Sequence, residues 1–259
     1  MLFRSGDKVG EQKAYHNLGD TYDSLGEFEK ALEYHEKHLR IARDEGDVVE
    51  EGKAYGDLGN DYYRLGNLEK AMECHERDLF VARNIGDKLR EGIAYGNLGN
   101  VYYMLREPIK AIEYHERELL VAKERGDETR EGRACGNLGK DYYSVRDFEK
   151  AIKFLEKKLL IAKEFGSRIQ EGEAYSNLGD LYASLNRNEK ASKCYQSSIK
   201  QVDIIRASLK CGDALKISFR DLHRGAYNGL WQSLLKLGRI DGALCAAEQG
   251  RAQKYSNTA

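Results

Sequence analysis

Three histidines recur at equal spacing, and histidine is the side chain that most often binds metal ions or moves protons near neutral pH. They are His35, His75 and His115, each 40 residues from the next. A shared zinc site would need its ligands to reach one point at about 2 Å, whereas packed helices lie roughly 8–10 Å apart. His35 and His38 share a helix face, but the spacing supplies no third ligand. We therefore predict structural histidines and no metal site.

The sequence gives equally little support for a phosphate-binding, catalytic or redox site. The glycines of Gly-Asn-Leu-Gly-Asn, residues 96–100, lie mid-helix, where backbone amides are already hydrogen-bonded, so this is no phosphate loop. The sequence contains no identifiable Ser/His/Asp or Cys/His grouping. The five cysteines lack metal or redox spacing and are typical of small buried side chains in a reducing compartment. We predict a cytoplasmic protein that is not an enzyme and needs no cofactor.

The histidines recur because the whole surrounding sequence repeats with the same spacing. Segments that begin at Ala14, Ala54, Ala94, Ala134 and Ala174 all read A-[YC]-x-[ND]-L-G-x-x-Y, followed by K-A and a helical tail. A fixed period of 40 residues is typical of stacked repeat units. Such arrays share one elongated core and offer long surfaces to other chains more often than active sites.

Each repeat contains signals for two helices. In residues 47–86, Asp47 predicts an N-cap with Glu50 three residues on, and helix A should run to about Leu65. Helix B should run from about Leu68 to Asn84, with Gly86 as its terminator. Pro108, the only proline, lies where another helix B should begin.

A glycine recurs at one phase inside every helix A, at residues 19, 59, 99, 139 and 179. Each costs about 1 kcal/mol relative to alanine in a helix interior. Repetition of that cost indicates that a side chain would not fit, and we expect helix B of the same unit to approach closely there.

Bulk composition excludes two partner classes. The 259 residues carry a net charge of −1, so no global positive field would attract nucleic acid or an anionic membrane. The longest aliphatic runs have four residues, such as Leu119–Ala122, whereas a membrane span needs about 20. We expect an all-α protein with no nucleic-acid or membrane partner.

The motif N-L-G-x-x-Y, with a small residue twelve positions after its glycine (Gly59 to Ala71), resembles the tetratricopeptide repeat. The 40-residue period and E-G-x-A-Y-G-N-L-G, residues 91–99, look like the repeats of G-protein-signalling modulators of the spindle-orientation type. This resemblance implies a right-handed superhelical solenoid of antiparallel helix pairs. It also implies a non-catalytic scaffold or adaptor that binds a peptide segment in a concave groove.

The repeat boundaries define the expected domains. Residues 1–10 match the end of a preceding repeat, so we expect the chain to be a fragment, an incomplete gene model or one arm of something longer. The repeats then occupy 11–46, 47–86, 87–126, 127–166 and 167–212, the last with a lengthened helix B. Residues 213–259 form a degenerate sixth helix pair or connector.

An alternative function comes from the tail. Residues 213–221 and 246–253 are similar to a connector in animal proteins of the tetratricopeptide repeat protein 28 type, where it precedes a caspase-like CHAT domain. That resemblance implies the regulatory arm of a truncated CHAT-domain protein, which would dock its own missing C-terminal domain. The CHAT catalytic residues would lie beyond Ala259. Self-association is also open, because an uncapped first helix and an apolar sixth unit could stack.

The tetratricopeptide resemblance implies which helix A positions line the groove. Small residues at Gly56, Gly96 and Gly136 should leave room for a bound backbone, and three tyrosines one repeat apart should anchor it. The alternative is that these tyrosines only fill the seam between repeats. The expected groove residues are Tyr63, Tyr103, Tyr143, Asn60, Asn100, Lys140, Arg64 and Met104, with Asn97, Asn137 and Asn177 as further candidates implied by the spindle-orientation relatives.

Overall fold

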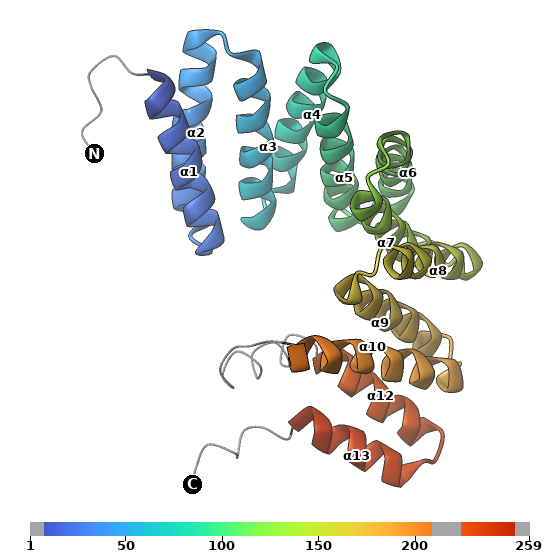
Figure 1. Ribbon diagram of the computed structural model, residues 1–259. Helices are drawn as coiled ribbons and strands as arrows, with labels where there is room; N and C mark the ends of the chain where they lie inside the picture. The colour runs from blue at the N-terminus through green and yellow to red at the C-terminus, as the bar shows by residue number, and fades with distance from the viewer. Residues whose placement is uncertain (1–7, 209–223, 252–259) are drawn as a thin grey trace, which may run out of the picture. The chain divides into compact units, whose positions relative to one another are not determined.

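The computed structural model describes residues 8–208 and 224–251. These residues form twelve helices and no strand. Figure 1 shows the helices following one another along the chain. They fall into two compact units, one up to Arg130 and the other from Glu131. Predictions that concern residues 1–7, 209–223 and 252–259 lie outside the described residues, including the start of the chain and much of the connector.

The first unit consists of three helix pairs. The A helices are α1 (Lys8–Ser24), α3 (Val48–Arg64) and α5 (Lys88–Met104), and the B helices are α2 (Phe28–Glu45), α4 (Leu68–Ile85) and α6 (Pro108–Arg125). From α1 to α6, each helix packs against its neighbour in the sequence of this unit, and α3 also contacts α5. The A helices therefore line up beside one another.

The second unit continues the alternation. Its helices are α7 (Glu128–Ser144, which begins at the end of the first unit), α8 (Phe148–Glu164), α9 (Arg168–Ser184), α10 (Asn188–Ser208), α12 (Arg224–Lys236) and α13 (Ile240–Arg251). Consecutive contacts join α8 to α9, α9 to α10, α10 to α12 and α12 to α13, and α9 also touches α12. Helix α10 has 21 residues, whereas α8 and α9 have 17 each.

Local signals at the helix ends act as the sequence predicts. The Asp47 carboxylate accepts a hydrogen bond of 3.0 Å from the backbone N–H of Glu50, at the start of α3. Gly86 ends α4 in the left-handed conformation with φ 73°, and Pro108 is the first residue of α6. The observed ends of α3 and α4 each differ by one residue from those expected.

The turn inside each helix pair requires a positive φ. Gly66 occupies this turn in the second pair with φ 78°. The equivalent positions in the later pairs hold Arg106, Arg146 and Asn186, with φ values of 60°, 62° and 56°. Residues with a Cβ are strained in this region, so these pairs have the required turn but not the residue that best suits it.

Alanine allows the two helices of a pair to pack closely. The alanine that follows each repeat lysine is completely buried in all five repeats, at Ala31, Ala71, Ala111, Ala151 and Ala191. The leucine that precedes the helix A glycine is buried in four of the five repeats, as Leu58, Leu98, Leu138 and Leu178, whereas Leu18 is 40 % exposed. The core is therefore a regular series of small and branched side chains.

Buried polar pairs lie where one helix pair meets the next. His38 of α2 is fully buried, and its Nε2 lies 3.2 Å from Glu50 of α3. One repeat later, Asp78 of α4 is 1 % exposed and accepts a 2.6 Å hydrogen bond from Arg90 Nε of α5. The B helix therefore carries a base in one pair and an acid in the next.

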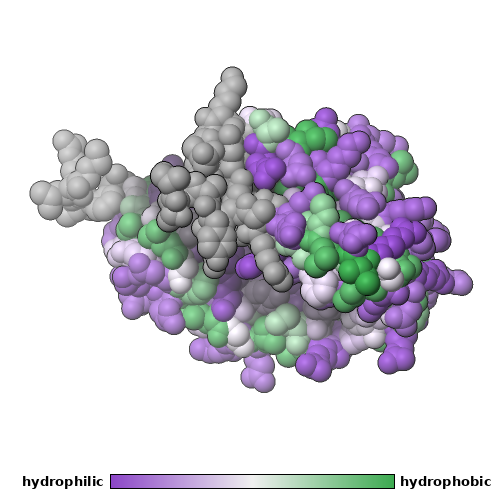
Figure 2. Space-filling model, turned by 90° about the horizontal axis from the view of Figure 1, so that it is seen from below, coloured by the Kyte–Doolittle hydropathy of each residue, from purple (hydrophilic) through white to green (hydrophobic). Residues whose placement is uncertain are grey.

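The surface is mixed. Hydrophilic and hydrophobic residues are interspersed over the face shown in Figure 2. Within residues 8–208 and 224–251, no helix has both the length and the apolar composition needed to cross a bilayer.

Candidate functional site

The recurrent glycines of the A helices lie directly beneath a B-helix side chain. A Cβ on Gly59 would come within 2.4 Å of the His75 imidazole, and one on Gly99 within 2.4 Å of His115. Leu155 fills the same place over Gly139, and Tyr195 fills it over Gly179. This confirms that helix B of the same unit excludes a side chain at these positions. The histidines of this series pack against backbone.

The small residues at Gly56, Gly96 and Gly136 do not leave room for a ligand, which corrects the sequence-based expectation. A Cβ on Gly56 would lie 2.9 Å from Asp78 Oδ2, and one on Gly96 would lie 2.7 Å from the Glu118 carboxylate. All three glycines are buried. B-helix side chains already occupy the space that these residues leave.

A cavity of about 390 Å³ lies on the side of the first unit where the A helices line up. Its lining comes from α1, α3, α4 and α5: Asp23, Asn60, Tyr63, Arg64, His75, Asn97 and Asn100. Five of these residues are among the groove residues expected from the sequence. The structure therefore brings Asn60, Tyr63, Arg64, Asn97 and Asn100 together around one hollow.

The cavity wall is polar, and part of it is already paired. The side-chain amide of Asn97 donates to Asn60 Oδ1 at 3.4 Å, and Arg64 Nε lies 3.1 Å from Asp23 Oδ1. The Asp23–Arg64 ion pair leaves this wall without a net charge. Asn100 adds a further amide, so the wall offers donors and acceptors side by side.

Two lining groups have shifted pKa values. Burial lowers the pKa of His75 to about 4, which keeps this imidazole neutral at physiological pH. Burial, and secondarily the neighbouring Tyr103, raises the pKa of Tyr63 above its usual range. Both groups are therefore uncharged at neutral pH and face the cavity as polar but neutral surfaces.

The other expected groove residues lie elsewhere. Tyr103 and Met104, at the end of α5, have 39 % and 52 % of their surface exposed and do not line the cavity. Lys140 and Tyr143 are exposed on α7, where the Tyr143 ring lies 5.8 Å from the ring of Phe148. Asn137 and Asn177 are half-buried. The second unit contains four of these residues, namely Lys140, Tyr143, Asn137 and Asn177.

The sequence prediction missed Asp23 and His75 as lining residues. Asp23 stands at the repeat position that holds tyrosine in Tyr63, Tyr103 and Tyr143, so its departure from the repeat was a visible signal. His75 was assigned only a structural role, because its access to the cavity depends on the glycine beneath it.

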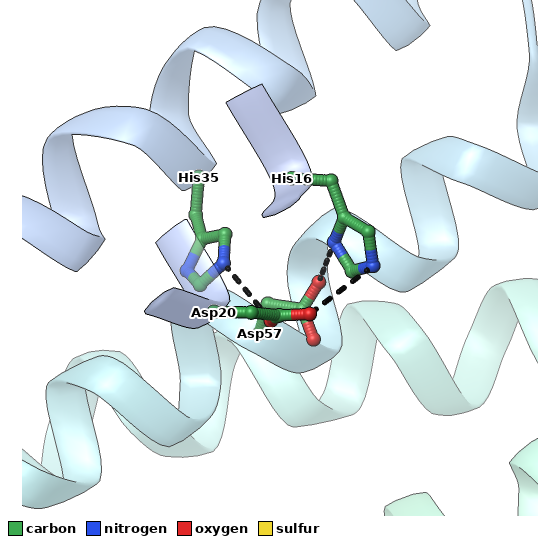
Figure 3. Close-up of side chains that lie close together, drawn as sticks. All are labelled: His16, Asp20, His35 and Asp57. Atoms are coloured by element: carbon green, nitrogen blue, oxygen red, sulfur yellow. Dashed lines mark ion pairs between the residues drawn. The ribbon is translucent and has the colours of Figure 1, made fainter. Parts of the chain in front are cut away.

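A second polar cluster lies one repeat earlier and was not predicted (Figure 3). His16 and Asp20 come from α1, His35 from α2 and Asp57 from α3, and one atom of each lies within 4.8 Å of the others. Asp57 Oδ2 lies 3.2 Å from His16 Nδ1, and Asp20 lies 3.5 Å from His16 Nε2 and 3.6 Å from His35 Nε2. These are the ligand types that bind transition metals.

The stacked helix pairs define an all-α helical-repeat solenoid. A model of the tetratricopeptide repeat matches residues 50–124 and 132–202, and a second tetratricopeptide model matches residues 14–49. The chain therefore belongs to the tetratricopeptide repeat family. The narrower resemblances to spindle-orientation and CHAT-associated proteins stay predictions. A search of curated protein sequences returned no match.

Solved structures share the fold at low sequence identity. BtubC from P. vanneervenii is 18 % identical with a TM-score of 0.73, and the match covers 87 % of this chain and 90 % of that one. A STAND protein with a tetratricopeptide repeat sensor from Pyrococcus horikoshii is 24 % identical with a TM-score of 0.75, over 95 % of this chain and 37 % of that one. A Rap protein complexed with Competence and Sporulation Factor is 16 % identical with a TM-score of 0.66, over 93 % and 74 %.

Proposed function

We propose that this chain is a non-catalytic scaffold that binds an extended peptide segment of a partner protein in the cavity of its first unit. The observation that carries the proposal is the convergence of Asn60, Tyr63, Asn97 and Asn100 on one hollow. A peptide backbone presents alternating N–H and C=O groups, and a carboxamide side chain both donates and accepts. Asparagines on two neighbouring A helices suit that pattern.

The size and charge of the cavity narrow the class of ligand. A volume of about 390 Å³ admits a short stretch of chain with one or two side chains. Because Asp23 and Arg64 neutralise each other, the wall favours uncharged polar or aromatic residues over strongly charged ones. The phenol of Tyr63 supplies an aromatic surface with a polar tip, a combination frequent at binding hot spots.

A structural neighbour supports the proposal by analogy. The Rap protein that shares this fold was solved in complex with Competence and Sporulation Factor. At 16 % identity that likeness concerns the fold alone, so the proposal for this chain depends on its own cavity residues.

The proposal can be tested with a random peptide library. Purified chain is used to select peptides, and the affinity of the best one is measured by calorimetry. We expect Asn60→Ala with Asn100→Ala to weaken binding at least tenfold, because two amide partners of the peptide backbone are lost, while circular dichroism and the melting temperature stay unchanged.

A matched control lies in a different cavity of the same unit. Arg77 helps to line a hollow of about 290 Å³ together with Tyr55, Tyr62 and Lys70. We expect Arg77→Ala to leave the affinity unchanged. The proposal is wrong if the asparagine variant binds as well as the wild type, or if the library yields no peptide.

A further inference from the structure

We propose that His16, Asp20, His35 and Asp57 form a binding site for one divalent transition-metal ion of the zinc class. The four side chains come from α1, α2 and α3, and Figure 3 shows the two imidazoles directed toward the two carboxylates. The inference is independent of the proposed peptide binding, because none of the four residues lines the cavity described above.

The spacing of the ligand atoms fits tetrahedral coordination. Ligand bonds of 2.0–2.1 Å place the corners of a tetrahedron roughly 3.3 Å apart. One ligand atom from each of the four side chains lies within 4.8 Å of the other three. His16 contacts Asp57 through Nδ1 at 3.2 Å and Asp20 through Nε2 at 3.5 Å, and only one of these nitrogens can bind the ion. Side-chain rotations that shorten the longer separations would bring one donor from each residue around one ion.

A buried nitrogen without a hydrogen bond points into the cluster. His35 is 2 % exposed, and its Nε2 makes no hydrogen bond. Its Nδ1 lies 2.6 Å from Asp61 Oδ2, an equally buried carboxylate. This carboxylate fixes the ring orientation and favours the tautomer whose Nε2 carries the lone pair, the arrangement found behind most metal-binding histidines.

Two further buried atoms in the cluster lack an aligned hydrogen bond, namely His16 Nδ1 and Asp57 Oδ2. They lie 3.2 Å apart, and in the His16 tautomer that carries its proton on Nε2 the two atoms present lone pairs to each other. Leaving buried polar groups unsatisfied costs free energy. A bound cation would relieve this cost for both groups at once.

Comparison with the next repeat shows that the cluster is specific to one junction. The position of His16 is held by Gly56 one repeat later, and those of Asp20 and Asp57 are held by Asn60 and Asn97. The histidine persists, as His75. His16 and Asp57 are thus departures from the repeat, whereas an aspartate recurs at the position of Asp20, as Asp180. The two departures converge with Asp20 and His35 on one point.

The donor set selects the class of ion. Mg²⁺ and Ca²⁺ take oxygen ligands, whereas imidazole suits Zn²⁺ and its neighbours in the first transition row. Two imidazoles with two carboxylates therefore favour Zn²⁺. A metal ion can reach the cluster from solvent past Asp20, whose side chain is 57 % exposed. The buried His35 closes the opposite side of the cluster.

The test uses the full chain, freed of metal with a chelator and kept reduced. Zn²⁺ is titrated against a chromophoric competitor, and we expect one saturable site per chain. The variant Asp20→Asn with Asp57→Asn copies the amides of the next repeat, and it should bind Zn²⁺ at least 100-fold more weakly. Asp61→Asn should weaken binding about 10- to 100-fold through the orientation of His35.

Two measurements separate this site from other zinc-binding groups. Nuclear magnetic resonance should show the His16 and His35 ring signals shifting with Zn²⁺, while the His75 signal does not move. Co²⁺ should give a visible spectrum typical of tetrahedral coordination without thiolate bands. As a matched control, His75→Leu removes an equally buried histidine and should leave zinc affinity unchanged.

The proposal is overturned if no saturable site is found, or if the double asparagine variant keeps wild-type affinity. It is also overturned if Co²⁺ shows cysteine thiolate ligands. Should the double variant fail to fold, the ring signals of the wild type decide the question, because a failure of His16 and His35 to respond to Zn²⁺ excludes the site.

Discussion

The imidazole of His75 lies against Gly59, so that a Cβ on this glycine would come within 2.4 Å of His75 Cε1. The same relationship joins a B-helix side chain to an A-helix glycine in all five repeats. It sets the distance between the two helices of each pair.

The first prediction is that Gly59→Ala destabilises the protein. Alanine improves helix propensity by about 1 kcal/mol, but the forced displacement of a buried ring is an overpacking change of about 1–3 kcal/mol. Unfolding in urea should show a net loss of stability. Adding His75→Ala should restore part of it, because the methyl group then enters the vacated space. Equal or higher stability of Gly59→Ala alone would contradict this account.

The second prediction concerns pH. Burial lowers the pKa of folded His75 to about 4, whereas an unfolded histidine titrates near 6.5. Between these values the unfolded chain binds a proton that the folded chain does not, so stability falls as the pH drops from about 6.5 to 4. Each unit of pKa difference corresponds to about 1.4 kcal/mol.

His75→Leu should remove this contribution, and Leu155 shows that leucine fits over the equivalent glycine. The urea midpoint of the variant should therefore fall less than that of the wild type between pH 7 and pH 4.5. If the urea midpoints of the variant and the wild type fall equally with decreasing pH, His75 does not contribute to the acid sensitivity.

The third prediction concerns the turn in the fourth repeat. Arg146 has a φ of 62°, a conformation that costs a residue with a Cβ about 1–2 kcal/mol. Arg146→Gly relieves that strain, while glycine also gives the unfolded chain more freedom. We expect a net gain of about 0.5–1 kcal/mol, measured by thermal unfolding.

The reverse substitution is the control for this turn. Gly66 has a φ of 78°, and no atom lies within 4 Å of where its Cβ would stand. Gly66→Arg should therefore destabilise through backbone strain alone. A gain in stability for Gly66→Arg would argue against strain as the cause.

Local and repeated features of the fold could be predicted from the sequence. The Asp47 cap and the left-handed Gly86 depend on a few neighbouring residues, so their outcome follows from local chemistry. The glycine series indicated a close approach because the same cost recurs five times. The repeat register also placed Asn60, Tyr63 and Asn100 on helices that lie side by side.

What occupies the space beside a small residue could not be predicted in the same way. Gly56 was expected to admit a ligand, but Asp78 fills that place from 22 positions along the chain. The cluster around His35 joins residues from three helices, and its signal is the departure of His16 and Asp57 from the repeat. Such departures lie outside the pattern that the repeats share, so the shared pattern does not reveal them.

The change from a buried base, His38, to a buried acid, Asp78, at successive junctions bears on how the helix pairs recognise their neighbours. Helix pairs built on one repeated sequence could pack in the wrong order, since their apolar faces resemble one another. If residues 50–89 were skipped, His38 of α2 would face Arg90 in place of Glu50, and it would lose the acidic partner that it has in the native order. The charge of the buried side chain at each junction thus favours the native order of the helix pairs.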